Sequence, residues 1–146
     1  MQTNNGDDNR RLDQRRDLEG LDARLQRLED MHISFLASVQ FRPGTEYNHT
    51  LLAHNIYGDM RIALTLVMNA IMTRALGETK TRGNVHNFPE DAQRAAFIFQ
   101  NGPITRKDAV RAIALVTDKS EATADLILKA SRDSGYALEA HRALGD

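Results

Sequence analysis

Apolar residues recur in alternating steps of three and four between residues 15 and 41, with charged and amide side chains between them. The positions in this row are Leu18, Leu21, Leu25, Leu28, His32, Phe35 and Val39. Such spacing is typical of the a and d positions of a coiled coil. Because two apolar positions in seven form a stripe too narrow to pack on a globular core, the pattern favours a helix that pairs with another helix. The alternative is a long helix packed on its own domain.

The same row predicts self-association. We expect a homo-oligomer, most simply a homodimer, held by the apolar side chains of the row and by a helix over 51–72; the row contributes Leu18, Leu21, Leu25, Leu28 and Phe35. His32 occupies an a position, where a polar group can set the register and would respond to pH. It is equally compatible with a polar residue tolerated near the end of the stripe.

A second helical stretch follows the turn signal Pro43-Gly44. We expect one long helix that begins near Glu46 or Asn48 and ends at Leu76, before Gly77. Its second half is apolar on more than one side, which is typical of a helix at the centre of a bundle or in an oligomer interface. Residues 15–76 are therefore interpreted as a helical oligomerisation region. Residues 1–14 are polar and predict a flexible tail.

The polar segment 77–87, "GETKTRGNVHN", predicts a linker before a C-terminal module over 88–146. Pro89 suits the start of a helix that ends at Gly102. Thr105 and Asp108 form the capping-box pattern T-x-x-D and predict a second helix. A third helix is expected after "DKSEAT", with Asp118 and Ser120 as candidate N-caps, a buried face of Ala124, Ile127, Leu128 and Ser131, and an end at Ser134-Gly135. The whole chain is thus predicted to be all-α, with a trihelical helix-turn-helix at its C-terminus.

The run "AAFIFQNGPITRKDAVRAIALVTDKSEATADLILKASRDSGYAL" resembles the winged-helix DNA-binding domains of bacterial and archaeal regulators. The likeness lies in an apolar first helix, "NGPIT" before the second helix, "S-x-x-T-A" at the start of the third, and "SGYAL" after it; it covers about fifty residues. The usual wing is a basic β-hairpin, whereas "ALEAHRALGD" favours a short helix or a frayed tail.

This resemblance implies an oligomeric DNA-binding protein, a transcriptional regulator or an accessory factor of a plasmid, phage or virus. On it, the second helix would hold the phosphate backbone and the turn and third helix would approach the groove. The candidate DNA-binding residues are Thr105, Arg106, Lys107, Arg111, Lys119, Ser120, Thr123, Lys129 and Arg132.

Charge supports a second interpretation. Residues 83–146 hold eight Lys and Arg against nine Asp and Glu, and DNA affinity depends on neutralising phosphates. The alternative is a helical assembly protein whose trihelical module binds protein rather than DNA.

Other function classes lack a sequence signal. The chain holds no P-loop, no G-x-G-x-x-G and no G-x-S-x-G, so we expect no enzyme activity and no cofactor. The five His residues share no metal-ligand spacing, so no metal is expected. There is no Cys, the N-terminus lacks an apolar signal region, and the most apolar run, 62–72, is too short to span a bilayer. These features favour a cytoplasmic protein with no membrane partner.

Overall fold

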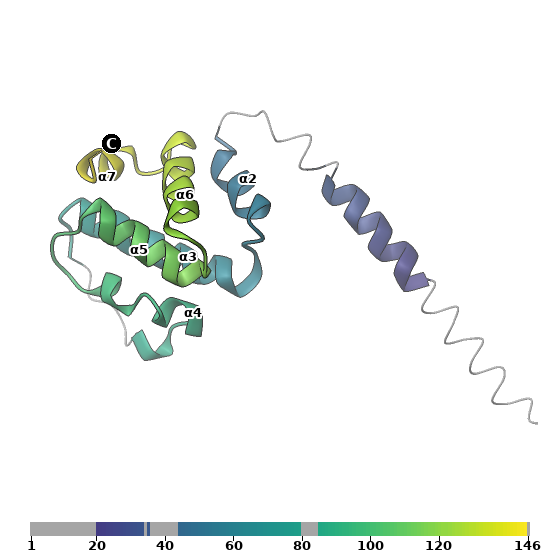
Figure 1. Cartoon of the computed structure of the whole chain (residues 1–146), viewed down its shortest axis with the longest axis horizontal. Coiled ribbons are helices and arrows are strands. Elements are labelled where there is room, and N and C mark those ends of the chain that lie inside the picture. Colours follow the sequence, from purple (N-terminus) through teal and green to yellow (C-terminus); the bar gives the residue numbers. More distant parts are fainter. Residues whose placement is uncertain (1–19, 34, 36–43, 80–84, 146) are drawn as a thin grey trace, which may run out of the picture. The chain divides into compact units, whose positions relative to one another are not determined.

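The structure is a computed structural model that describes residues 20–33, 35, 44–79 and 85–145. Every regular element among these residues is a helix and none is a strand, which confirms the predicted all-α class (Figure 1). The chain divides into two units, Met1–Phe41 and Arg42–Asp146. In the ranges just given, no helix has both the length and the apolarity to cross a membrane.

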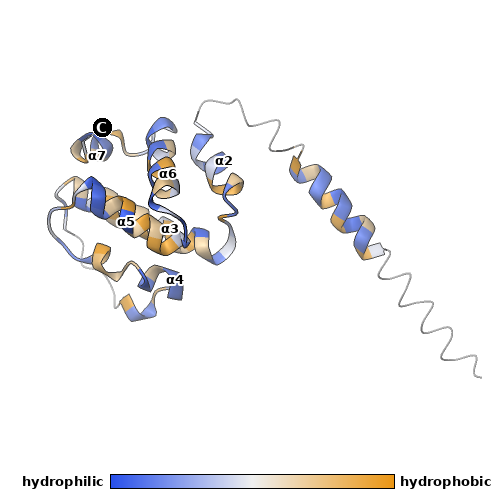
Figure 2. Cartoon of the chain, in the orientation of Figure 1, coloured by the Kyte–Doolittle hydropathy of each residue, from blue (hydrophilic) through white to orange (hydrophobic). Residues whose placement is uncertain are grey.

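The first unit contains a helix over 20–33, with residue 35 also helical. Figure 2 shows apolar and polar residues alternating along it. The predicted seam residues Leu21, Leu25, Leu28 and Phe35 are 50%, 56%, 61% and 60% exposed in the single chain. The helix itself is thus confirmed over these residues, and its apolar stripe is open to solvent in the single chain. Leu18 lies outside the described residues.

The second unit is built around one central helix, α3 (Gly58–Ala75). The other elements are α2 (Glu46–Ala53), η1 (Val85–Asn87), α4 (Glu90–Gln93), η2 (Ala96–Phe99), α5 (Arg106–Thr117), α6 (Glu121–Asp133) and α7 (Leu138–Ala143). Helix α3 contacts α4, α5 and α7, and α6 packs against both α5 and α2 (Figure 1).

The core lies where α3, α5 and α6 meet. The fully buried side chains there include Leu64, Val67 and Ile71 from α3, Ile113 and Val116 from α5, and Ile127 and Leu128 from α6. Because α3 supplies this much of the core, it belongs with the C-terminal helices. The sequence pattern places it instead in a region with the N-terminal helix and separates it from the module by the segment 77–87.

The prediction of one helix from near Glu46 to Leu76 is wrong, because the chain bends between α2 and α3. Asn55 adopts the left-handed conformation at φ 58°, which Asn tolerates better than most residues. Gly58 also has a positive φ, 60°. The bend turns Ile56 fully into the core, where its amide donates to the carbonyl of Leu51 at 2.8 Å. Burial of Ile56 therefore outweighs the continuity of the helix.

The predicted helix from Pro89 to Gly102 is also interrupted. The chain forms the short α4, a turn, and then the 3₁₀ helix η2. Its buried positions Ala92, Ala95 and Ile98 are three residues apart, as expected where the backbone winds near three residues per turn. A regular helix with Ala92, Ala95, Ala96 and Phe99 on one buried face would bury Ala96, but Ala96 is exposed, while Phe99 is buried.

Helices α5 and α6 follow the sequence prediction closely. Thr105 and Asp108 form the capping box of α5, and all four residues expected on the buried face of α6 are buried. Ser120 is the N-cap of α6, whereas the other candidate, Asp118, is the left-handed C-cap of α5.

Candidate functional site

The candidate DNA-contact residues gather on α5, α6 and the turn between them, and those at the helix starts act as caps. Asp108 Oδ2 accepts hydrogen bonds from Thr105 Oγ1 at 2.8 Å and from Thr105 N at 3.1 Å. The Thr105 hydroxyl in turn accepts from Asp108 N at 3.1 Å. The hydrogen bonds from Thr105, its side chain first, hold the pKa of the Asp108 carboxyl below its usual value. Thr105 is therefore engaged in starting α5.

Ser120 and Thr123 form the corresponding cap of α6. The Ser120 hydroxyl accepts from Thr123 N at 3.2 Å and donates to Thr123 Oγ1 at 3.1 Å. Upstream, Asp118 turns the chain with φ 53°, and Lys119 N donates to Ala114 O at 3.2 Å. Two capped helices thus meet through a tight turn, and three of the nine candidates have structural roles there.

A single carboxylate on α6 pairs with two of the candidate cations. Asp125 Oδ1 lies 2.9 Å from Arg106 Nη2, and its Oδ2 lies 2.8 Å from Lys129 Nζ. The hydrogen bonds from Lys129 and then from Arg106 lower the pKa of the Asp125 carboxyl, so it carries its negative charge at neutral pH. The two cations predicted to meet phosphate and base are therefore joined through one acid, a pairing that sequence reasoning missed.

The remaining candidate cations have different surroundings. Arg132 Nε lies 3.1 Å from a carboxylate oxygen of Asp133. The guanidinium of Arg111 lies 5.3 Å from the ring centroid of Phe97, within the range of a cation–π contact. Lys107 is exposed and Lys119 is half-buried. Positive charge on this surface is thus concentrated on the α5 side.

The segment after α6, predicted to be a short helix or a frayed tail in place of the usual wing, is helical. After α6 the chain turns through Ala137, at φ 47°, into α7. His141 on α7 is buried, and its Nε2 lies 3.4 Å from Ser131 Oγ on α6. Over the described residues, α7 takes the place that a basic β-hairpin would have.

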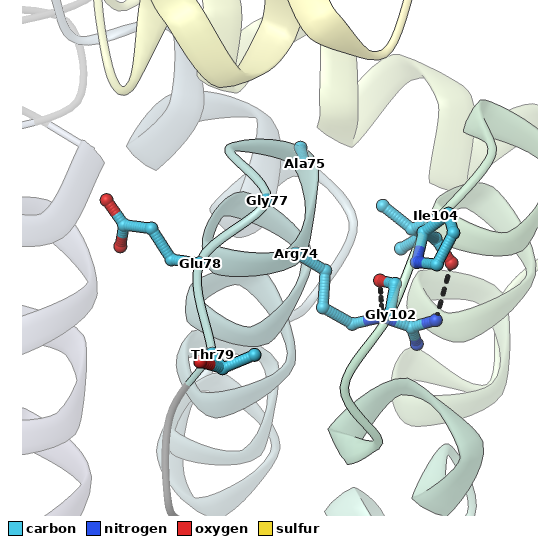
Figure 3. Close-up of a pocket in the computed structure, with 8 residues that line it drawn as sticks. Arg74, Ala75, Gly77, Glu78, Thr79, Gly102 and Ile104 are labelled. Carbon is cyan, nitrogen blue, oxygen red and sulfur yellow. Dashed lines mark hydrogen bonds between the residues drawn. The ribbon is translucent and has the colours of Figure 1, made fainter.

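One arginine that sequence reasoning did not select is bound entirely by backbone oxygens. Arg74, in the last turn of α3, donates to Gly102 O at 3.0 Å and Pro103 O at 2.7 Å (Figure 3). It also donates to Phe97 O and Ile98 O at 3.3 Å each. It lines a pocket of about 390 Å³ with the loop before α5. Because its guanidinium is committed to these carbonyls, we interpret Arg74 as a structural clamp rather than a ligand-binding group.

A second pocket, of about 420 Å³, lies between α2, α3 and the turn after α6. Tyr47 and Tyr136 meet at its rim in an edge-to-face arrangement, with ring centroids 6.0 Å apart. Burial raises the pKa of the Tyr47 hydroxyl to about 12, against the opposing influence of the Arg61 charge. No spacing or motif in the sequence predicts this pocket, because the residues that line it come from three separate segments.

The described residues hold no group of three or more His, Asp or Glu side chains placed to bind a metal ion. No protein-family model, curated protein or solved structure matches this chain.

Proposed function

We propose that this protein is a self-associating helical interaction protein, in which residues 18–39 pair with the same segment of a second copy and the 42–146 unit binds another protein. The observation that carries the proposal is the exposed row of Leu21, Leu25, Leu28 and Phe35, which is flanked between residues 22 and 30 mainly by charged and amide side chains. Burying one such side chain contributes about 1.5–3 kcal/mol. A second copy is a suitable cover because it presents the same row at the same spacing.

The charges beside the row favour a parallel pair. Arg24 precedes the a residue Leu25 and so lies at g, while Glu29 follows the d residue Leu28 and lies at e. In a parallel, in-register pair, a g residue faces the e residue of the next heptad, so Arg24 faces Glu29 of the second copy twice. The unfavourable contact of Asp17 with Asp22 also occurs twice, but it lies at the end of the row, where Asp17 is outside the described residues.

An antiparallel pair aligned over residues 20–33 lacks this attraction. It brings e positions together, so Asp22 faces Glu29 of the second copy, and it places Arg24 opposite Met31. Both acids are exposed in the single chain. Like charges in close apposition destabilise a helix pair, so the parallel arrangement is the one that we propose.

Charge reversal at Glu29 tests association and orientation together. In a parallel pair Glu29→Arg places an arginine of each copy opposite Arg24 of the other copy. The repulsion is expected to raise the dimer dissociation constant about threefold to tenfold at low salt. Adding Arg24→Glu restores the attraction and should return the constant to that of the parent. Sedimentation equilibrium over a range of concentrations measures both effects, and Arg27→Glu, at a position away from the row, is the matched control.

Self-association and the parallel orientation of the pair are refuted by different results. A parent chain that sediments at the single-chain mass of 16.4 kDa at every concentration would refute self-association. A dimer that is strengthened by Glu29→Arg would refute the parallel orientation alone, because the introduced guanidinium would then lie against Asp22.

DNA binding by α5 and α6 is the second candidate. It is favoured by two capped helices joined by a tight turn, the arrangement expected of a helix-turn-helix, and by Lys107 and Arg111 on the exposed side of α5. Pairing two such units would raise a weak affinity through avidity. The acid bridging Arg106 and Lys129 opposes it, which is why we place it second.

Replacing Asp125 separates the two candidates. If α5 and α6 hold DNA, Asp125→Asn removes the negative charge that Arg106 and Lys129 share, strengthens binding to a random duplex and steepens the salt dependence by about 0.9 per added phosphate contact. Lys107→Ala with Arg111→Ala should then weaken binding on all sequences. A gel-shift titration at two salt concentrations gives the answer, with Glu139→Gln on α7 as a control for the change in net charge. A parent protein and Asp125→Asn variant that both leave the duplex unshifted at low salt would remove DNA as a partner.

A further inference from the structure

We propose that the pocket between α2, α3 and the turn after α6 binds a small organic acid: a carboxylate attached to a compact apolar body. Its volume, about 420 Å³, is in the range of small-molecule sites. The proposal is independent of self-association and of DNA binding, because every described residue that lines the pocket belongs to the 42–146 unit and lies outside α5.

The pocket has one positive charge and no negative one. Arg61, half-buried on α3, is the single cation among the described residues that line it, and none of those residues is Asp or Glu. The guanidinium donates from Nη2 to Asn48 Oδ1 at 2.6 Å, a neutral acceptor. The positive charge is therefore held in place by an amide and is not balanced by a carboxylate in the pocket.

The Arg61 guanidinium and the Tyr47 hydroxyl are donors that suit a carboxylate. The Tyr47 hydroxyl is protonated at physiological pH, and burial raises its pKa further, to about 12, so it can donate and does not repel an anion. A guanidinium can bind both oxygens of a carboxylate through parallel N–H groups. Asn69, exposed on the same side of α3, adds an amide at the edge, whereas the Thr65 hydroxyl is already used in donating to Arg61 O at 2.9 Å.

The rest of the lining is apolar and adaptable. Met68 and Met72 come from successive turns of α3, and the rings of Tyr47 and Tyr136 close one side. Methionine side chains adjust to different apolar shapes, and aromatic edges favour a flat or compact ligand body. A single cation beside such a lining matches a monocarboxylate better than a phosphate group, whose higher charge usually requires several donors or cations.

The test compares two ligands that have the same shape and differ in charge, phenylacetate and phenylacetamide. Binding to the full chain is measured from backbone amide shifts in NMR spectra. We expect saturable shifts that centre on Tyr47, Arg61, Met68 and Met72, and an affinity for phenylacetate about tenfold higher than for the amide. Arg61→Gln should abolish this preference, whereas the matched change Arg94→Gln, on an exposed arginine paired with Asp91, should keep it.

A second variant keeps the test decisive if Arg61→Gln fails to fold. Asn69→Phe places a bulky group from the exposed edge of α3 into the pocket without altering the core, and should abolish binding of both ligands. The proposal is overturned if the two ligands bind equally, if folded Arg61→Gln keeps the preference, or if neither ligand gives saturable shifts at these residues.

Discussion

Changing both Leu21 and Leu25 to Asp is expected to reduce the mass of the protein in solution to that of the single chain, 16.4 kDa. Each substitution replaces an apolar side chain, worth about 1.5–3 kcal/mol when buried, with a charge in the centre of the proposed seam. In a dimer each change occurs twice, so the combined loss exceeds what a short helix pair can tolerate. Light scattering coupled to size-exclusion chromatography measures the result.

The same variant should leave the 42–146 unit folded. No described residue before Leu51 belongs to its buried core cluster, so its thermal unfolding should match that of the parent after dissociation is taken into account. Ala23→Asp with Gln26→Asp adds the same two charges away from the row and should keep the dimer. If the Leu21 and Leu25 variant keeps both the parent's mass and its melting temperature, the row is not an interface.

Replacing Arg74 by Met is expected to lower the free energy of unfolding of the 42–146 unit by about 2 kcal/mol. The substitution keeps a long side chain over the pocket wall and removes the charged donor shared by four backbone carbonyls. The carbonyls of Gly102 and Pro103 can be hydrated in part, since both residues are exposed, which keeps the loss below the sum of four charged hydrogen bonds. For a unit of this size the midpoint of thermal unfolding should fall by roughly 8–16 °C.

Two further variants make the Arg74 result specific. Arg74→Lys should recover only part of the loss, because a single ammonium group cannot reach the same set of carbonyls. Arg94→Met removes an exposed arginine paired with Asp91 and should cost at most about 1 kcal/mol. An Arg74→Met protein no less stable than Arg94→Met would show that the clamp contributes nothing to the fold.

Local signals were enough to predict α5 and α6. Thr105 with Asp108 and Ser120 with Thr123 fix the two helix starts within three residues of chain, and the buried face of α6 repeats at helical spacing. Capping and periodicity depend on near neighbours, so a sequence displays them directly.

The parts that the sequence did not reveal depend on distant contacts. The bend at Asn55 exists because Ile56 finds space in a core made largely by other helices. The pairing of Arg106 with Asp125 joins residues nineteen positions apart, and the contacts of Arg74 with the loop near Gly102 span a still longer separation. The sequence identifies Arg106 and Lys129 as cations, but only the fold shows that both form ion pairs with the same carboxylate, that of Asp125.

The central position of α3 limits which segments of this chain recombination can transfer as a folded unit. A segment cut at residue 88 would carry α5 and α6 but leave Ile113, Val116 and Ile127 without the α3 side chains that complete their core. The α5–α6 pair is therefore not a unit that recombination can transfer by itself. Any rearrangement that keeps this surface must move α2 and α3 with it, whereas the described N-terminal helix contributes nothing to that core and is free to be exchanged.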